Sequence, residues 1–228
     1  MGTLATTLIS RFFKRRDESV GEVFTTAEAV DLLNEAQHEL AMLELVQKSL
    51  SFTFDASAYD EYSLPNDYMS MGYNGVNVAG EKVTFIDEAD LSSRYPEWQS
   101  ESSSDETAFA FIRRSTAGKL KLRLFPDLST DQTVDFTYIA MPTDIPDAPT
   151  TEYVMNGLSI PGVDRFLLYR MLEASAYNDE EIDLADRFAR RAESALQEIM
   201  TWKNLSHGNE MQGIMTDMSM LNEYMDDY

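Results

Sequence analysis

Few residues in this chain are suited to catalysis or metal binding. The sequence contains no cysteine and two histidines, His38 and His207, which lie far apart along the chain. Disulfides and thiolate zinc sites are therefore excluded, and an imidazole-based metal site is not expected. Acidic residues are abundant, but no apolar-flanked pair of Asp or Glu stands out as a general acid and base. We predict that the protein is not an enzyme and uses no cofactor or metal.

One segment resembles part of a nucleotide-binding site. Val83 to Asp90 is an apolar stretch with an acidic end, like the strand that holds magnesium in helicase-type ATPases. Such an ATPase needs a phosphate loop, GxxxxGK[ST], upstream of that strand. The Gly-Lys pair of this chain, Gly118-Lys119, lies downstream and is followed by Leu120. We therefore interpret the segment as a strand that runs into a short helix, Glu88 to Ser93.

The charge of the chain limits its partners. There are 40 acidic and 18 basic residues, a formal charge of −22, and four of the basic residues precede Asp17 while no acidic residue does. From Asp17 onward the chain therefore contains 14 basic and 40 acidic residues. This balance argues against a sequence-reading DNA binder and fits a surface that DNA slides past, a DNA mimic or adaptation to a saline medium. No run of 18 apolar residues occurs, and the first basic cluster follows an apolar stretch, the reverse of a secretory signal, so we expect a soluble intracellular product.

The N-terminal segment Thr3 to Arg16 is predicted to be a helix with an apolar side and a basic end. We expect it to dock on an acidic neighbour, either its own chain or another subunit; a membrane-surface or nucleic-acid contact is the alternative. The residues that would make this contact are Arg11, Phe12, Lys14, Arg15 and Arg16.

The spacing of apolar residues predicts three longer helices. Thr25 and Glu28 have capping-box spacing and predict a helix over Ala27 to Gln47. Val163 to Tyr177 predicts a second helix, and Asn178 with Glu181 predicts the start of a third at about Asp179. So short a turn between the last two predicts an antiparallel helical hairpin, against which the first helix packs.

Between these helices the apolar period changes to two, which predicts strands. The clearest β-hairpin turns at Ala117-Gly118, and we place five basic residues on its outer face: Arg113, Arg114, Lys119, Lys121 and Arg123. This cluster is either a contact for an acidic partner surface or a solvated strand face.

The sequence after Lys203 contains five methionines, five acidic residues and no Lys or Arg. Apolar residues recur there at steps of three and four, and methionine surfaces adapt well to a partner. The alternatives are an arm that folds on a partner and a last helix folded back on its own subunit. The predicted portion of this arm that contacts a partner is Met211, Ile214, Met215, Met218, Leu221, Tyr224 and Met225.

The fold class predicted from these elements is α+β. We expect an antiparallel helical bundle, formed by the N-terminal helix and the C-terminal hairpin, with an inserted small antiparallel β domain and an extended or helical C-terminal arm. The expected segments are an N-terminal arm with the first bundle helix at 1–50, the β domain at 51–141, a Pro-rich linker with the helical hairpin at 142–205, and the partner-binding arm at 206–228.

The order of several short motifs resembles the head-to-tail adaptor, or connector, proteins of tailed bacteriophages. The first is AxDLLNEAQxEL at Ala29 to Leu40, followed by Tyr-x-Leu-Pro-x-Asp at Tyr62 to Asp67 and by a loop around Trp98. The later ones are Leu124-Phe125-Pro126, Phe136-x-Tyr138 followed by Pro142, and an acidic turn from Asn178 to Asp186. The acidic body and the long methionine-rich tail depart from the family's pattern.

This resemblance implies a structural protein of the virion neck, the head–tail junction, made in the host cytoplasm. Similar proteins form a homo-oligomeric ring, here expected to be dodecameric, which docks on the portal protein through the C-terminal segment. The ring would be the platform for a tail or nozzle protein and a channel through which double-stranded DNA passes during genome ejection without sequence-specific binding. No membrane partner is expected. An acidic DNA mimic or other interaction module that binds a basic partner is the alternative function.

Overall fold

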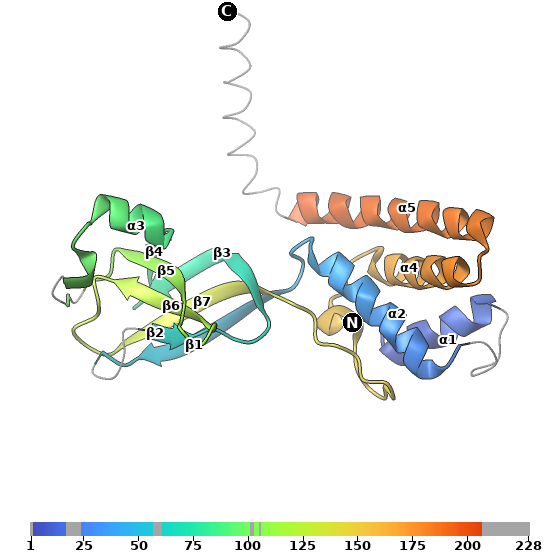
Figure 1. Cartoon of the computed structure of the whole chain (residues 1–228), viewed down its shortest axis with the longest axis horizontal. Coiled ribbons are helices and arrows are strands. Elements are labelled where there is room, and N and C mark those ends of the chain that lie inside the picture. Colours follow the sequence, from blue (N-terminus) through green and yellow to red (C-terminus); the bar gives the residue numbers. More distant parts are fainter. Residues whose placement is uncertain (1, 17–23, 57–60, 101–102, 105, 207–228) are drawn as a thin grey trace, which may run out of the picture. The chain divides into compact units, whose positions relative to one another are not determined.

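The computed structural model describes residues 2–16, 24–56, 61–100, 103–104 and 106–206. The chain divides into two compact units, one formed by Met1–Leu45 with Pro142–Tyr228 and the other by Val46–Met141. We refer to them as the helical unit and the β unit (Figure 1).

The helical unit contains α1 (Ala5–Arg16), α2 (Thr26–Ala41), α4 (Val163–Asn178) and α5 (Ile182–Ser206). α4 packs against each of the other three helices, and α4 and α5 form the predicted antiparallel hairpin (Figure 1). The unit has a continuous apolar core because each helix contributes fully buried side chains. Examples from α1, α2, α4 and α5 are Leu8, Leu33, Leu167 and Ile199.

The ends of these helices show which of the predicted capping residues are correct. The capping box of α2 is confirmed: the Thr25 side chain accepts a hydrogen bond from the Glu28 N–H, and the Glu28 carboxylate accepts one from the Thr25 N–H. The helix ends at Ala41 rather than Gln47, because the chain turns through Glu44, whose φ is 57°, and then enters a strand.

The predicted start of the last helix is wrong. α5 begins at Ile182, and the Glu181 carbonyl rather than Asn178 accepts the first hydrogen bonds, from the Leu184 and Ala185 N–H groups. Glu180 has a φ of 61°, so the chain between the two helices leaves the helical conformation and cannot continue α4 into α5.

A linker with a short 3₁₀ turn, η2 (Val154–Gly157), leads into α4. Two side-chain amides of α2 form hydrogen bonds with the backbone of this linker. Asn34 exchanges hydrogen bonds with the backbone of Ile145, at 3.0 and 2.9 Å, and Gln37 accepts one from the Met155 N–H at 2.6 Å. Gln37 is fully buried and also donates to Asn34, so both amides are satisfied within this network.

The β unit is one mixed sheet with the strand order β1-β7-β3-β4-β5-β6-β2. Its strands are β1 (Gln47–Phe54), β2 (Glu61–Ser63), β3 (Tyr68–Val78), β4 (Glu81–Phe85), β5 (Phe109–Arg114), β6 (Leu120–Phe125) and β7 (Gln132–Ala140). All neighbouring strands are antiparallel except β4 and β5, which are parallel. The edge strands β1 and β2 approach through stacked rings of Phe52 and Tyr62, 3.6 Å apart, so the sheet is a nearly closed barrel.

The predicted fold class is therefore wrong. The chain is mixed α+β, with five α-helices in its described part and a seven-stranded barrel-like sheet, instead of a helical bundle with a small antiparallel insertion. Two features that apolar alternation does not encode account for the difference: the parallel pairing of β4 with β5 and the approach of β1 to β2. α1 packs in the core of the helical unit, where Phe12 is fully buried, and this agrees with the expectation that it docks on its own chain.

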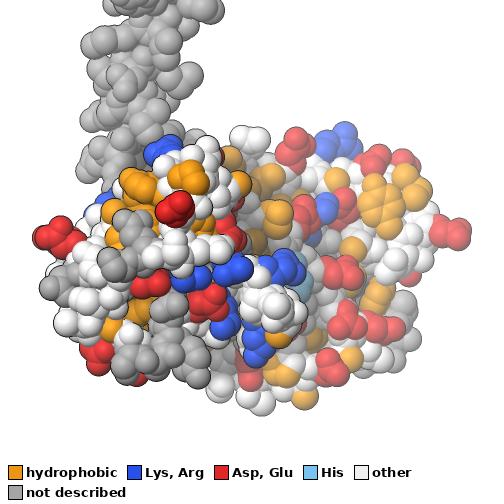
Figure 2. Space-filling model, turned by 60° about the vertical axis from the view of Figure 1, so that its left-hand side comes forward, with side chains coloured by type: hydrophobic (Ala, Val, Ile, Leu, Met, Phe, Trp, Pro, Cys, Tyr) orange, Lys and Arg blue, Asp and Glu red, His pale blue; other side chains and the backbone are white. Residues whose placement is uncertain are grey.

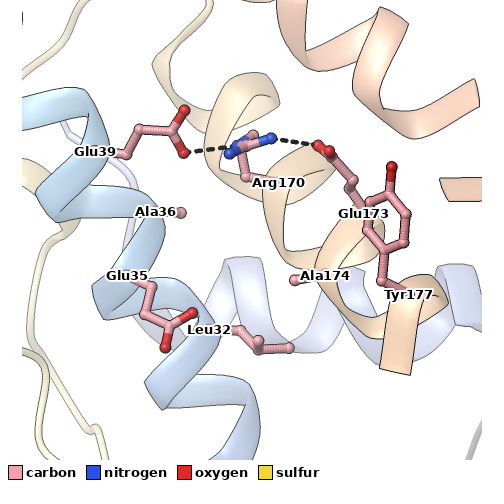
Figure 3. A pocket seen from close by; sticks show the side chains of 8 residues that line it. All are labelled: Leu32, Glu35, Ala36, Glu39, Arg170, Glu173, Ala174 and Tyr177. Carbon is pink, nitrogen blue, oxygen red and sulfur yellow. Dashed lines mark hydrogen bonds and ion pairs between the residues drawn. The ribbon is translucent and has the colours of Figure 1, made fainter. Parts of the chain in front are cut away.

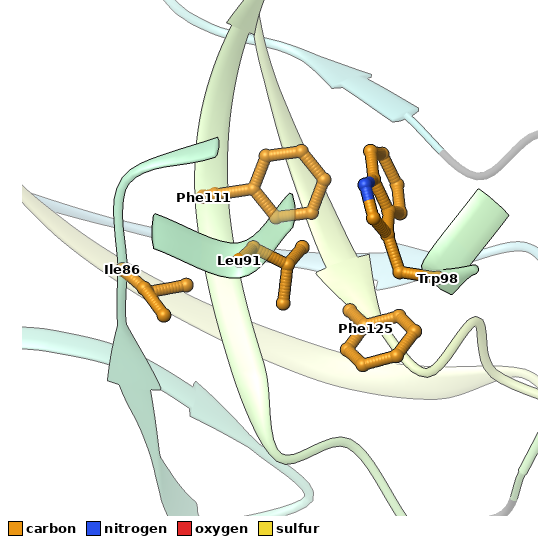
Figure 4. Close-up of a cluster of buried hydrophobic side chains, with 5 residues drawn as sticks. All are labelled: Ile86, Leu91, Trp98, Phe111 and Phe125. Carbon is orange, nitrogen blue, oxygen red and sulfur yellow. The ribbon is translucent and has the colours of Figure 1, made fainter. Parts of the chain in front are cut away.

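A second apolar cluster lies under α3 (Glu88–Arg94) and η1 (Trp98–Ser100). Its members come from four elements and the chain between them, and Figure 4 shows them converging: Ile86, Leu91, Trp98, Phe111 and Phe125. The predicted helix after Val83 is confirmed, and its acidic start is a cap, because the Asp87 carboxylate accepts the Ala89 N–H at 2.8 Å.

Candidate assembly surfaces

The predicted partner-binding arm, Met211 to Met225, lies outside the described residues. Its role is taken up below as a proposal.

The basic end of α1 lies on the helical unit itself. Arg16 forms ion pairs with Asp179 and Glu181 in the turn between α4 and α5, and its side chain is only 10% exposed. Arg11 forms an ion pair with Asp164 at the start of α4, at 3.0 Å. These contacts tie α1 to both ends of α4, and they complement the negative charge that gathers there.

The other three predicted contact residues of α1 differ in accessibility. Phe12 is fully buried and cannot meet a partner, whereas Lys14 and Arg15 are exposed. The Arg15 guanidinium lies 5.5 Å from the ring of Tyr169 on α4, and that of Arg191 on α5 lies 5.7 Å from the same ring. Two guanidinium groups thus lie near one aromatic ring. The negative electrostatic potential at the faces of the ring attracts both cations.

The basic β-hairpin is confirmed as a hairpin, with β5 and β6 paired in antiparallel register and Gly118 at a φ of 79° in the turn. Its five cations do not share one face. Arg113 pairs in register with Lys121, while Arg114 pairs with Leu120 on the opposite face, because successive residues of a strand alternate. Figure 2, which brings the β unit forward, shows Lys and Arg side chains with Asp and Glu among them.

Three of the five cations are engaged within the β unit. Lys121 and Arg113 both approach the Glu61 carboxylate, at 2.9 and 3.9 Å, and Arg113 also approaches Glu88 at 3.5 Å. Arg123 pairs with Asp127 at 3.4 Å, and its guanidinium lies 5.0 Å from the Trp98 ring. The cluster predicted as a partner contact is therefore largely neutralised by its own unit.

Arg114 and Lys119 differ from these three. Both are exposed, and neither side chain has an ion pair within the described part of the chain. The turn between them is ordered by three hydrogen bonds between Ser115 and the residues Gly118 and Lys119, at 2.8 to 3.2 Å. We call these two residues with their turn the hairpin tip.

A groove between α2 and α4 was not anticipated from the sequence. It encloses a cavity of about 280 Å³ lined by Leu32, Glu35, Ala36, Glu39, Arg170, Glu173, Ala174 and Tyr177. Figure 3 shows Arg170 between Glu39 and Glu173, and Glu35 and Tyr177 further along the groove. The acidic spacing of Glu35 and Glu39 on α2 was visible in the sequence, but their meeting with α4 depends on tertiary packing.

Arg170 is fixed at the centre of the groove. Its Nε donates to Glu39 at 2.7 Å and one terminal nitrogen donates to Glu173 at 2.6 Å. Burial alone would lower the pKa of Arg170, but the hydrogen bonds and charges of the two carboxylates outweigh it and raise that pKa. The guanidinium therefore stays charged, and three carboxylates face one cation in this groove.

Two further observations concern the described ranges alone. None of their helices combines the length and apolar character needed to cross a membrane. No group of three or more His, Asp or Glu side chains in them is placed to hold a metal ion.

The class that the fold and its surfaces define is a two-unit mixed α+β protein, in which charged groups such as Lys121 and Arg170 pair with carboxylates of their own unit. The sequence matches the family model described as SU10 adaptor protein over residues 3–213, and the chain belongs to this family. No curated protein matches the chain.

Membership confirms the resemblance to phage head-to-tail adaptors. The protein is a structural adaptor of a phage particle, from a family that is generally non-enzymatic and associates with other head and tail proteins.

Proposed function

We propose that this adaptor forms a dodecameric ring at the head–tail junction, docks on the portal protein and supports a tail or nozzle protein. Double-stranded DNA passes through the ring without sequence-specific binding. The observation that carries the proposal is the family match over residues 3–213, which spans both units.

The charge of the chain supports the role as a DNA channel. With 40 acidic against 18 basic residues the surface repels a phosphate backbone, so DNA would move past it without being held. The basic clusters do not reverse this, because Arg16 and three cations of the hairpin pair with carboxylates of the same unit.

The arm at Met211 to Met225 is the element that we assign to portal docking. Its apolar residues recur at helical spacing, and its flexible methionines can adapt to the surface of another protein. α1, the other terminal element with an apolar stripe, already buries that stripe within the helical unit.

The test is a truncation that removes residues Met211 to Tyr228. Because the described part of the chain already contains a buried apolar core in each unit, the truncated protein should keep the thermal unfolding midpoint and far-ultraviolet dichroism of that part. We expect it to lose cosedimentation with isolated portal rings. Binding equal to that of the full chain would remove the arm from the proposal.

A matched pair of full-length variants separates apolar docking from mere chain length. Replacing Met211, Met215, Met218 and Met225 with Leu keeps the stripe, and replacing the same residues with Ser removes it. The Leu variant should bind portal rings and the Ser variant should not. Apolar docking tolerates added salt, whereas an acidic DNA mimic would lose its basic partner steeply as salt increases.

A further inference from the structure

The groove between α2 and α4 has the composition of a receptor for a basic side chain. Glu39 uses one carboxylate oxygen for Arg170, and its side chain remains 47% exposed. Glu35 is exposed and has no ion pair within the described residues. An additional cation would therefore find one free carboxylate and one shared carboxylate, a turn of α2 apart.

The remaining lining fits the rest of such a side chain. Leu32, Ala36 and Ala174 offer an apolar strip along which an aliphatic stem can lie. Tyr177 is 47% exposed and presents a ring at the same groove, where a guanidinium or ammonium group can stack. Carboxylates, an apolar strip and an aromatic ring together favour Arg or Lys over a small cation.

The hairpin tip has the complementary chemistry. Arg114 and Lys119 are exposed cations without an ionic partner in the described part of the chain, whereas their neighbours Arg113 and Lys121 share Glu61. The hydrogen bonds of the turn, including Ser115 N–H to the Lys119 carbonyl at 2.8 Å, order the short backbone segment at whose two ends Arg114 and Lys119 lie. The ordered turn would lose little backbone entropy when the tip binds.

We infer that the hairpin tip of one copy docks into the α2–α4 groove of the next copy. The inference rests on the proposed function, because it assumes a homo-oligomeric ring. The partner is another copy since the tip and the groove are complementary in charge and both belong to this chain, so every copy in the assembly carries both. The two surfaces are different, so the contact is head-to-tail, the kind of interface that closes rings.

Charge reversal tests this pairing. The tip variant carries Arg114→Glu and Lys119→Glu, and the groove variant carries Glu35→Lys and Glu39→Lys. Each alone places like charges at every interface, so we expect self-association at least about tenfold weaker than that of the unmodified chain, measured by sedimentation velocity. A second groove variant, Glu35→Lys alone, leaves the Arg170 network intact in case the double substitution impairs folding.

A mixture of the tip variant and the groove variant tests whether the two surfaces bind each other. In an equimolar mixture the reversed tip meets the reversed groove and the original tip meets the original groove, so alternating oligomers should form although neither variant assembles alone. A chain with all four substitutions should assemble by itself. Controls of equal charge change at exposed positions elsewhere, Lys82→Glu with Arg94→Glu and Asp183→Lys with Glu193→Lys, should assemble normally.

The same samples are also mixed with portal rings, so that assembly on a template is measured as well. If the unmodified chain forms oligomers and the reversed variants form them equally well, this inference is overturned and the ring proposal stands. If the unmodified chain forms none, alone or on the portal, both are overturned. Loss of self-association by folded reversed variants that mixing does not restore would also overturn the inference.

Discussion

The aromatic ring of Phe52 on β1 stacks on that of Tyr62 on β2, with centroids 3.6 Å apart and planes inclined by 15°. β1 and β2 are the two ends of the strand order, and no backbone pairing joins them among the described residues. This pair of side chains therefore closes a sheet that its backbone leaves open.

The first prediction concerns this closure. Replacing Phe52 with Leu keeps an apolar side chain and removes the ring pair, which should lower the free energy of unfolding of the β unit by about 1 kcal/mol. Tyr62→Leu should have a similar effect. Urea unfolding of both single variants and the double variant should give a coupling energy of about 0.5–1.5 kcal/mol.

Ser51→Ala, at an exposed position next to Phe52, is the control and should change stability by less than about 0.5 kcal/mol. Additive effects of the two ring substitutions would show that the rings do not stabilise each other.

The second prediction concerns Gln37. Its side chain is fully buried and accepts the Met155 N–H at 2.6 Å, so Gln37→Leu leaves that N–H without an acceptor. The expected loss is about 1–3 kcal/mol of unfolding free energy. Amide hydrogen exchange of the linker around Met155 should accelerate in the same variant. Asp31→Asn, exposed on the same helix, should leave both measurements unchanged, and equal effects of the two substitutions would argue against a role for the network.

The third prediction concerns the docking of α1. Arg16 is 10% exposed and pairs with Asp179 and Glu181, so Arg16→Gln should cost about 2 kcal/mol, because the substitution leaves two partly covered carboxylates without their cation. Lys14→Gln, an exposed cation two residues away, should cost less than about 0.5 kcal/mol. Thermal unfolding measures both. If the two variants unfold at the same temperature, the Arg16 ion pairs do not hold α1 in place.

The fourth prediction is a pH dependence. Burial and the neighbouring Asp67 carboxylate, which accepts the hydroxyl of Tyr138 at 3.2 Å, raise the pKa of Tyr138 to about 12. The unfolded chain loses this proton first, near pH 10, so the stabilisation is complete below that value and is lost as the pH rises through about 12.

Tyr138→Phe has no proton to lose and should flatten the loss of stability between neutral pH and about pH 11, measured by urea unfolding. Burial likewise raises the pKa of Tyr68 to about 12, so part of the dependence should remain in this variant. Parallel stability curves for the unmodified chain and Tyr138→Phe would contradict the assignment.

The sequence predicted those elements whose signals are local. The capping box at Thr25 and Glu28, the α4–α5 hairpin and the β5–β6 hairpin all depend on residues close together in the chain, and the structure confirms them. The parallel pairing of β4 with β5 and the approach of Phe52 to Tyr62 join segments through tertiary contacts, which alternation of apolar residues does not specify. The fold class was wrong for this reason.

The same distinction holds for the assembly surfaces. The basic residues of the hairpin were visible as a cluster, but the pairing of Arg113 and Lys121 with Glu61, and of Arg113 with Glu88, depends on β2 and α3. The α2–α4 groove was missed because Arg170 and Glu39 lie far apart in the sequence and meet only in the folded unit. The sequence thus showed which residues are charged. Which of these residues are left without an ion pair within the described part depends on the fold.

Cryo-electron microscopy of the full chain mixed with portal rings tests the proposed adaptor role most directly. We expect a second ring of twelve copies, coaxial with the portal, with density for residues 211–225 against the portal surface. Portal rings that remain bare while the folded protein stays monomeric in the same sample would contradict the proposal.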